Sequence, residues 1–178
     1  EIQAIFRDTF YENSFGTVGV ENKETENDTL KVIEVTPYRL ESEYSDGRHP
    51  DEVKFSKNLS DDLKRRDFTM NAIAYSPETG ELVDLYDGQD AIKDKMIKAV
   101  GDANERFGED ALRILRAVRF STQHGFAIEH ETMSAMEKNA GLLAKISAER
   151  IRDEFTKMLL APEPIVGIVM AQKLGILK

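Results

Sequence analysis

The sequence predicts an α+β fold in two parts, with strands and helices mixed over residues 1–100 and helices alone over residues 101–178. Two observations lead to this prediction. Before Gly101, short runs of β-branched and aromatic residues alternate with turn-forming residues, as strands and their connections do. After it, apolar residues recur three and four positions apart, and the pattern breaks at glycine and proline. The 178 residues, 40% of them apolar, suffice for one domain of ordinary size or two small ones.

The first part is expected to open with a helix and a β-hairpin. Apolar residues at helical spacing predict the helix over residues 1–12. Residues 15–20 and 30–36 are strand-like and are interpreted as the two strands of the hairpin, joined by an acidic linker. Residues 37–58 contain two prolines and a glycine, which predicts a loop-rich connector. Ser60 is followed by two aspartates and is the predicted N-cap of a short helix.

Short strands and one more helix complete the first part, and three or four helices form the second. The predicted strands are 73–75, 82–85 and 96–100, with the helix over 90–95. The predicted helices of the second part are 109–123, 130–143, 147–160 and 163–174. Ser147 is the natural N-cap of the third of these helices.

Composition and motifs exclude several classes of protein. No stretch approaches the ~20 apolar residues that cross a bilayer and no signal-peptide pattern is present, so we expect a cytoplasmic protein without a membrane span. The lack of cysteine excludes a disulfide scaffold, a zinc ribbon and a thiol nucleophile. No P-loop or Rossmann glycine pattern occurs, and the histidines form no catalytic set. Because the chain starts at Glu1 inside a predicted helix and ends on an apolar run, we expect both ends to be cut.

Positive charge gathers in two segments of an acidic chain. The net charge of −9 argues against a broad basic surface of the kind that binds nucleic acid generally. Basic residues nevertheless cluster at 64–66 and again within 106–119. This distribution predicts a focused anion site.

The segment EDALRILRAVRF, residues 109–120, carries the strongest signal. On a helix its arginines step by three and fan over one arc, at positions Arg113, Arg116 and Arg119. Asp110 lies three residues before the first of them, which makes their side chains neighbours on a helix. Such a face is either a salt-bridged solvent surface or a binding face for a polyphosphate. Few acids are available to neutralise the arginines, and this favours the polyphosphate.

The segment KRRDFTMNA, residues 64–72, changes abruptly from charged to small and apolar residues. Arg66 can hold a phosphate through its planar fork. Asp67 and Asn71 could hydrogen-bond a sugar hydroxyl. The alternative is a helix C-terminus whose basic residues offset the helix dipole, and the segment alone leaves both interpretations open.

Two further acidic features allow a metal or a plain structural role. Alternation in the strand 32–36 makes Glu34 either a solvated residue or a carboxylate that faces a metal, and both stay open. The segment 84–90, DLYDGQD, lacks the spacing of a Ca²⁺ loop, so a turn that leads into a helix is favoured over a metal site.

Taken in order, these segments resemble the class II tRNA nucleotidyltransferase (CCA-adding enzyme) and bacterial poly(A) polymerase family. The matching segments are VTPYR with YSDGRHP, KRRDFTMNAIAY, DLYDGQDAIKDKMI, EDALRILRAVRF and SAERIRDEFTKML. They extend over essentially the whole chain. The resemblance implies an incomplete nucleotidyltransferase head of the polymerase-beta-like, mixed-sheet kind over 1–100. It also implies a helical neck over 101–178, with the nucleotide in the cleft between them.

The resemblance also implies roles for individual residues. The nucleotide-binding set is Arg66, Asp67, Asn71, Asp110, Arg113, Arg116 and Arg119. Its first three members lie at the ribose and phosphate end, Asp110 and Arg113 face the base edge, and the last two face the phosphates. Glu109 supports the segment. Glu34 matches the family's third catalytic, metal-binding acid, and the aspartate pair that holds two Mg²⁺ ions is absent from this sequence.

The implied function is transfer of nucleotides from CTP and ATP to the 3′ end of tRNA without a nucleic-acid template, with Mg²⁺ as cofactor. Poly(A) polymerase and a split CC-adding or A-adding enzyme are alternatives within the family. Two alternatives lie outside the enzymes of this family: a non-catalytic nucleotide- or RNA-binding fragment, and a plain helical scaffold. Without the aspartate pair, we expect the chain alone to be inactive. The oligomeric state stays open.

Overall fold

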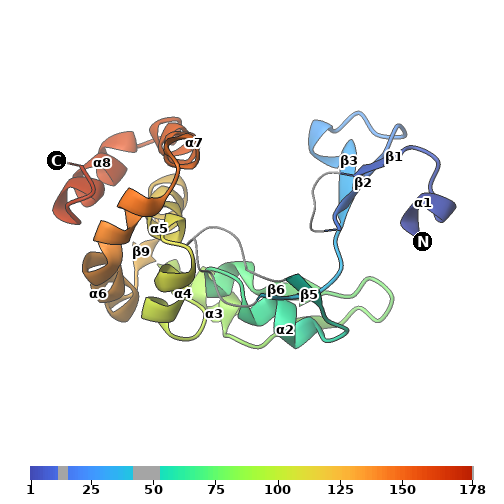
Figure 1. Cartoon of the computed structure of the whole chain (residues 1–178), viewed down its shortest axis with the longest axis horizontal. Helices are drawn as coiled ribbons and strands as arrows, with labels where there is room; N and C mark the ends of the chain where they lie inside the picture. The colour runs from blue at the N-terminus through green and yellow to red at the C-terminus, as the bar shows by residue number, and fades with distance from the viewer. Residues whose placement is uncertain (12–15, 42–52, 178) are drawn as a thin grey trace.

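The computed structural model describes residues 1–11, 16–41 and 53–177, and it confirms the α+β fold. The chain runs from a small sheet, through a group of short strands and helices, into a helical region (Figure 1). The first sheet stands apart at one end of the molecule, and the C-terminal helices gather at the other (Figure 1).

The N-terminal sheet has three antiparallel strands in the order β1–β2–β3. Helix α1 (Ile2–Ile5) precedes β1 (Thr9–Tyr11), β2 (Val18–Glu21) and β3 (Val32–Val35). The pairing of β2 with β3 confirms the hairpin, although residue 15 of its first predicted strand lies outside the described residues.

The helix predicted over residues 1–12 is wrong beyond α1. Residues 9–11 pair with β2 instead, and this puts Phe10 opposite Gly19. A Cβ atom on Gly19 would lie 2.5 Å from the Phe10 ring, so the ring packs where a side chain is missing. The partner strand β2 follows closely in the sequence, but helical spacing within residues 1–12 does not reveal the pairing.

Short strands and helices occupy the middle of the chain. The antiparallel pairs are β4 (Arg39–Glu41) with β5 (Val53–Phe55), and β6 (Ile73–Tyr75) with β7 (Leu82–Asp84). The helices are α2 (Leu59–Lys64), the 3₁₀ turn η2 (Thr69–Asn71) and α3 (Gly88–Lys93). The last two strands and α3 confirm the predictions to within about two residues.

Two predictions for this middle region need correction. The connector predicted over 37–58 contains the paired strands β4 and β5, and its residues 42–52 lie outside the described residues. Helix α2 begins one residue before Ser60, with Asn58 at the N-cap position. Ser60 therefore lies in the first turn, and its prediction as the N-cap is wrong.

The helical region contains the predicted helices and one more. Its helices are α4 (Ala103–Glu109), α5 (Leu112–His124), α6 (His130–Asn139), the 3₁₀ helix η3 (Ala140–Lys145), α7 (Ala148–Leu159) and α8 (Pro164–Lys173). The sequence does not predict α4, because seven residues give too short a periodic pattern. Asp102 caps α4 by accepting hydrogen bonds from the N–H groups of Asn104 (2.8 Å) and Glu105 (3.0 Å). Ser147 is confirmed at the N-cap position of α7.

Asp110 separates α4 from α5. Its backbone is extended, with φ −145° and ψ 101°, so the helix predicted from residue 109 begins only at Leu112. The Asp110 carboxylate accepts a hydrogen bond from the N–H of Leu112 at 3.0 Å and satisfies one donor at the start of α5.

The buried core lies around α5. It includes Val118 of α5, Met136 of α6 and Met158 of α7. It also includes Phe68 and Ile97, so both predicted parts contribute to one cluster. The strands β8 (Met96–Ile97) and β9 (Ala127–Ile128) pair in parallel and join the two parts as well. The division at residue 100 stays a prediction. Among the helices of the described segments, none has the length and apolar character to span a membrane.

Candidate functional site

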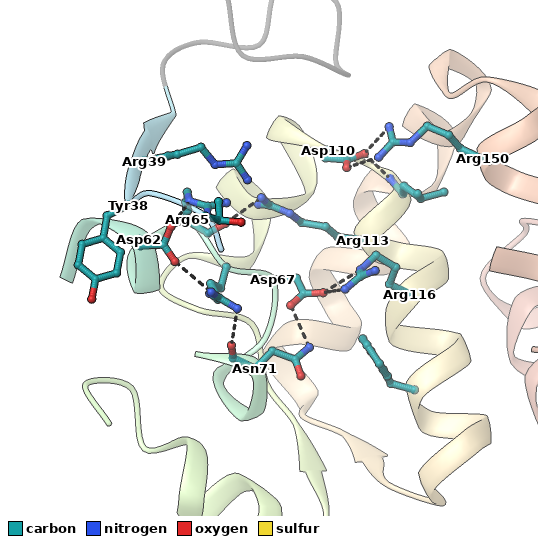
Figure 2. Close-up of a pocket in the computed structure, with 14 residues that line it drawn as sticks. Tyr38, Arg39, Asp62, Arg65, Asp67, Asn71, Asp110, Arg113, Arg116 and Arg150 are labelled. Atoms are coloured by element: carbon teal, nitrogen blue, oxygen red, sulfur yellow. Dashed lines mark hydrogen bonds and ion pairs between the residues drawn. The ribbon is translucent and has the colours of Figure 1, made fainter. Parts of the chain in front are cut away.

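A pocket of about 670 Å³ lies between α2 and α5, with α7 beside it (Figure 2). The predicted site residues that line it are Arg66, Asp67, Asn71, Asp110, Arg113 and Arg116. In all, six arginines and three aspartates line the pocket, which leaves a formal excess of three positive charges. A local excess of this kind in a chain of net charge −9 is what a focused anion site requires.

Asp67 is the centre of a hydrogen-bonded group at the base of the pocket (Figure 2). Its Oδ1 accepts hydrogen bonds from the N–H of Phe68 at 2.9 Å and from Nδ2 of Asn71 at 3.1 Å. Its Oδ2 accepts from Nε of Arg116 at 2.8 Å and lies 2.7 Å from Nη2 of the same side chain. Asp67 therefore fixes Asn71 and Arg116 relative to each other.

A second aspartate, Asp62, binds two arginines of the pocket, Arg65 and Arg66. Its carboxylate accepts hydrogen bonds from Nε of Arg65 and Nη2 of Arg66, both at 3.0 Å. Burial alone would raise the pKa of the Asp62 carboxyl, but hydrogen bonds and charge attraction from Arg65 and Arg66 outweigh it and hold this pKa below its ordinary value. Asp62 therefore stays ionised and anchors both guanidiniums near neutral pH.

Asp110 and Arg113 both line the pocket, and each binds other partners among the described residues. Asp110 precedes α5 and binds Arg150 of α7, whose Nη2 donates to Oδ2 at 2.7 Å. Arg113 binds Glu109 and backbone carbonyl groups instead. The backbone is extended at Asp110, so this residue lies outside the helix α5 that carries Arg113.

Arg113 joins the helical region to α2. Its Nη1 donates to the carbonyl oxygen of Arg106 at 3.1 Å and to Oε2 of Glu109 at 2.7 Å, and its Nη2 donates to the carbonyl oxygen of Arg65 at 2.9 Å. Nη1 of Arg106 donates to the carbonyl oxygen of Lys64 at 3.2 Å. These guanidiniums cap the C-terminal end of α2, where carbonyl groups have no partner within the helix. Glu109 binds Arg106 as well as Arg113.

Arg119 is not brought to the pocket. Its Nε donates to Oε2 of buried Glu154 at 2.6 Å, and its guanidinium carbon lies 4.0 Å from the centre of the Phe120 ring. Burial would raise the pKa of Glu154, but hydrogen bonds from Arg119 and Lys157 hold it below its ordinary value. The predicted arc of arginines is divided, with Arg113 and Arg116 at the pocket and Arg119 between α5 and α7.

The acids with a possible metal role also lie outside the pocket. Glu34 is exposed on β3, opposite Gly19, in the sheet that stands apart in Figure 1. Asp84 accepts hydrogen bonds from the N–H groups of Gly88 and Gln89, both at 2.8 Å, which confirms a turn into α3. In the described residues no group of three or more histidine, aspartate or glutamate side chains could hold a metal ion. The metal-binding role implied for Glu34 therefore stays a prediction.

Several lining residues were not predicted as site residues. They are Thr36, Tyr38, Arg39, Asp62, Arg65, Leu112, Phe120 and Arg150. Asp62 had a local signal, since it lies three and four residues before Arg65 and Arg66, at the spacing of helical ion pairs. Arg150 had none, because 40 residues separate it from Asp110.

A positively charged pocket that contains forked donors and carboxylates defines a protein suited to bind a phosphate-bearing ligand. Two family descriptions match the chain. "Poly A polymerase head domain" matches residues 1–98, and "Probable RNA and SrmB- binding site of polymerase A" matches residues 125–178. The chain belongs to the poly(A) polymerase head-domain family.

Similar proteins carry the name CCA-adding enzyme. The chain is 47% identical over 171 residues to one from Limosilactobacillus reuteri (strain DSM 20016), with 94% of this chain and 40% of that protein covered. It is 51% identical over 135 residues to one from Lactiplantibacillus plantarum, with 76% of this chain and 33% of that protein covered. The chain thus spans about two fifths, or less, of the length of these relatives.

Solved structures of such enzymes share the fold. The Bacillus stearothermophilus CCA-adding enzyme in complex with CTP has a TM-score of 0.85 at 40% identity, with 98% of this chain and 40% of that one covered. A tRNA nucleotidyltransferase complexed with a primer tRNA and an incoming ATP analog has a TM-score of 0.76 at 26% identity, with 95% and 45% covered. The arrangement of mixed head and helical neck is confirmed by these likenesses.

Proposed function

We propose that this chain is the nucleotide-recognition part of an enzyme that adds C and A from CTP and ATP to the 3′ end of tRNA without a nucleic-acid template. The observation that carries the proposal is the pocket. It joins Arg66, Asp67 and Asn71 to residues 110, 113 and 116. The chain is 47% identical to a CCA-adding enzyme over 171 residues. The relatives solved with CTP, and with a primer tRNA and an ATP analog, support the same ligands here.

Asp110 and Arg113 suit the recognition of the base. Cytosine and adenine each present an amino donor beside a ring-nitrogen acceptor, whereas uracil and guanine reverse that pattern. The Asp110 carboxylate can accept from the amino group and the Arg113 guanidinium can donate to the ring nitrogen of cytosine or adenine. With uracil or guanine, acceptor would face acceptor and donor would face donor. Since Asp110 and Arg113 bind separate partners, they do not neutralise each other.

Arg66 and Arg116 suit contact with the phosphates. Their side chains are 44% and 34% exposed, and each is anchored on one edge by a buried aspartate, Asp62 and Asp67 respectively. An anchored guanidinium loses less side-chain freedom when it binds a ligand through its other N–H groups. Arginine forks also match phosphate oxygens in geometry.

Residues 67–71 suit the sugar end of the pocket. Asp67 already accepts three hydrogen bonds and makes one further ion-pair contact with Arg116, so its two oxygens have little capacity left for a sugar hydroxyl. We therefore assign Asp67 to holding Asn71 and Arg116 in place, and Asn71 to the sugar contact.

Mg²⁺ is proposed as the cofactor of the longer enzyme, because two metal ions can align an attacking hydroxyl with a phosphate in nucleotidyl transfer. The described residues form no metal site, and Glu34 is exposed and apart from the pocket. The role of Glu34 as a catalytic metal ligand stays a prediction.

A non-catalytic nucleotide- or RNA-binding module is the second candidate for this chain on its own. The lack of a metal-holding group among the described residues favours it. An assay with this chain, tRNA, CTP, ATP and Mg²⁺ tests whether the chain alone transfers nucleotides. We expect no addition of nucleotides, and measurable addition would overturn the expectation that the chain alone is inactive.

The recognition proposal is tested by titrating the chain with CTP, ATP, UTP and GTP in Mg²⁺, beside the variant Asp110→Ala. We expect CTP and ATP to bind at least roughly 10-fold more tightly than UTP and GTP, since a good pair of hydrogen bonds discriminates between bases by about that factor. The variant should lose this preference. Asp153→Ala is the matched control, because Asp153 is an exposed aspartate paired only with exposed Arg152 among the described side chains.

Each other outcome contradicts the proposal in a different way. Equal binding of all four nucleotides would reduce the pocket to a phosphate site without base recognition. Retained preference in Asp110→Ala would remove Asp110 from the recognition of the base. No binding of any nucleotide would overturn the proposal for this chain.

A further inference from the structure

Arg150 makes a contact at the pocket that sequence spacing does not reveal. It lies in the first turn of α7 and reaches the carboxylate of Asp110. Its Nη2 lies 2.7 Å from Oδ2 of Asp110, and its Nη1 lies 3.3 Å from Oδ1. Figure 2 shows the two side chains meeting end to end at the pocket. This is a two-pronged guanidinium–carboxylate contact, which fixes orientation as well as distance.

Asp110 depends on this contact for its orientation. Its extended backbone between α4 and α5 gives its side chain no helical turn to pack on. Within the described part of the chain, the other hydrogen bond to this carboxylate comes from the N–H of Leu112, at 3.0 Å to Oδ1. An ionised carboxylate has about four lone-pair sites, and three are taken, so the remaining site lies on Oδ2.

Arg150 is itself held in place by the packing of α7. One turn further along, Glu154 pairs with Arg119 of α5 at 2.6 Å, and both side chains are close to fully buried. Gln123 of α5 donates to the carbonyl oxygen of Lys157 at 3.4 Å. These contacts fix α7 along α5, so the position of Arg150 follows from helix packing.

Arg113, the other base-facing residue, has a separate set of supports. It is bound by Glu109 and by backbone carbonyl groups of Arg106 and Arg65. Among the described residues, Arg150 is the side chain that binds Asp110 from another helix. The spacing between the donor and the acceptor offered to a base therefore depends on Arg150.

From this geometry we propose that Arg150 is a positioning residue that sets the preference of the pocket among bases by fixing Asp110 as an acceptor. The inference rests on the proposed function, in which Asp110 contacts the base. With Arg150 in place, a base must bring a donor to the remaining lone pair on Oδ2. Without Arg150, the carboxylate rotates about its side-chain torsions. Its oxygen is then no longer held against the carbonyl oxygen of uracil or guanine, so the repulsion that rejects these bases is lost.

The test compares Arg150→Ala and Arg150→Lys with Arg152→Ala as the matched control. Arg152 lies on the same helix, is 70% exposed and pairs with exposed Asp153. Each variant is titrated with CTP, UTP and inorganic tripolyphosphate in Mg²⁺. We expect Arg150→Ala to lower the CTP-over-UTP preference roughly 10-fold, about the value of one good pair of hydrogen bonds. Arg150→Lys keeps the charge and loses the fork. It should lose part of the preference while it binds tripolyphosphate within about twofold of the unchanged protein.

A double variant distinguishes positioning from a general loss of structure. Because Arg150 acts through Asp110, adding Arg150→Ala to Asp110→Ala should leave the CTP-over-UTP ratio where Asp110→Ala alone puts it. Thermal unfolding of each variant verifies that it is folded, and Arg150→Lys keeps the test decisive if Arg150→Ala does not fold.

Three results would overturn the inference while the proposed function survives. The preference could persist in both Arg150 variants. Binding of CTP, UTP and tripolyphosphate could fall by one common factor, which is the effect of a merely structural residue. Arg150→Ala could still change the ratio in the Asp110→Ala background. If instead the unchanged protein shows no preference among bases, the proposed function fails first and this inference fails with it.

Discussion

Glu154 shows how a single buried carboxylate couples the stability of this protein to pH. Burial raises its pKa, and hydrogen bonds from Arg119 and Lys157 lower it further than burial raises it, so the folded value lies below the ordinary 4.5. A group with a lowered pKa stabilises the fold above its unfolded pKa, and this stabilisation is lost as the pH falls through the folded pKa. We therefore expect the contribution of Glu154 to the free energy of unfolding to decrease as the pH falls below about 4.5.

We expect Glu154→Gln to lower the free energy of unfolding by about 3 kcal/mol at neutral pH, because it leaves the buried Arg119 without its counter-charge. This difference should stay constant down to about pH 5 and narrow below it. Urea unfolding of both proteins over a series of pH values measures it, with Glu137→Gln, a change at an exposed position, as the control. A difference that stayed the same down to pH values of about 3 would contradict the lowered pKa.

At the scale of residues, spacing within a segment predicts which side chains share a face but not which distant partner each one meets. The sequence predicts the arc of arginines on α5, and two of them line the pocket. Arg119 points to Glu154, 35 residues later, and Asp110 points to Arg150, 40 residues later. Both partners lie on α7, and only the packing of that helix on α5 brings them near. The six predicted residues that do line the pocket come from segments whose spacing is local.

At the scale of elements, α8 packs closely enough on its neighbours to need a glycine. A Cβ atom on Gly167 would lie 2.5 Å from Sδ of Met158 on α7 and 2.5 Å from Oγ1 of Thr122 on α5. Neither neighbour moves freely, because Met158 is 1% exposed and the Thr122 hydroxyl donates to the carbonyl oxygen of Val118 at 2.7 Å. The close approach of three helices is therefore set at this position.

We expect Gly167→Ala to lower the free energy of unfolding by about 1–2 kcal/mol, since overpacking exceeds the gain in helix propensity. Gly108→Ala is the matched control, because Gly108 also lies in a helix but a Cβ atom there would meet no atom within 4 Å. The control should raise stability by about 0.5 kcal/mol. Denaturant unfolding measures both changes. If both variants gained stability, α8 would not pack as closely as described.

Elements with a complete local signal are predictable from this sequence, and elements that form only by pairing with another strand are not. The strands β6 and β7 flank a short turn, and α7 follows a serine N-cap, so their positions are confirmed. The strand β1 forms because β2 offers it an edge, and β9 forms because β8 lies beside it. Neither of these two-to-three-residue strands has a pattern long enough to be distinguished from a helix or a loop.

At the scale of the whole molecule, the buried core is unevenly distributed. The core cluster begins at Phe68 and continues to Leu174, and it contains no residue of the β1–β3 sheet. That sheet buries Val18 and Val20 but leaves Tyr11, Val32 and Ile33 exposed, at 67%, 42% and 50%. The resemblance to known enzymes predicts the head and the neck, yet it does not predict that the core unites residue 68 with the helices.

This uneven core predicts two levels of stability in one chain. A three-stranded sheet with few buried apolar side chains is marginal, whereas α5 is packed on several sides by the common core. We expect backbone amides of β2 to exchange with deuterium at least roughly 100-fold faster than those of α5, because the sheet opens without unfolding of the core. Hydrogen exchange followed by mass spectrometry measures both segments in the same sample. Equal protection of β2 and α5 would mean that the sheet unfolds only together with the core. The result also bears on Glu34, because a metal ligand must be held within a fraction of an ångström, and a sheet that opens readily cannot hold it so without further support.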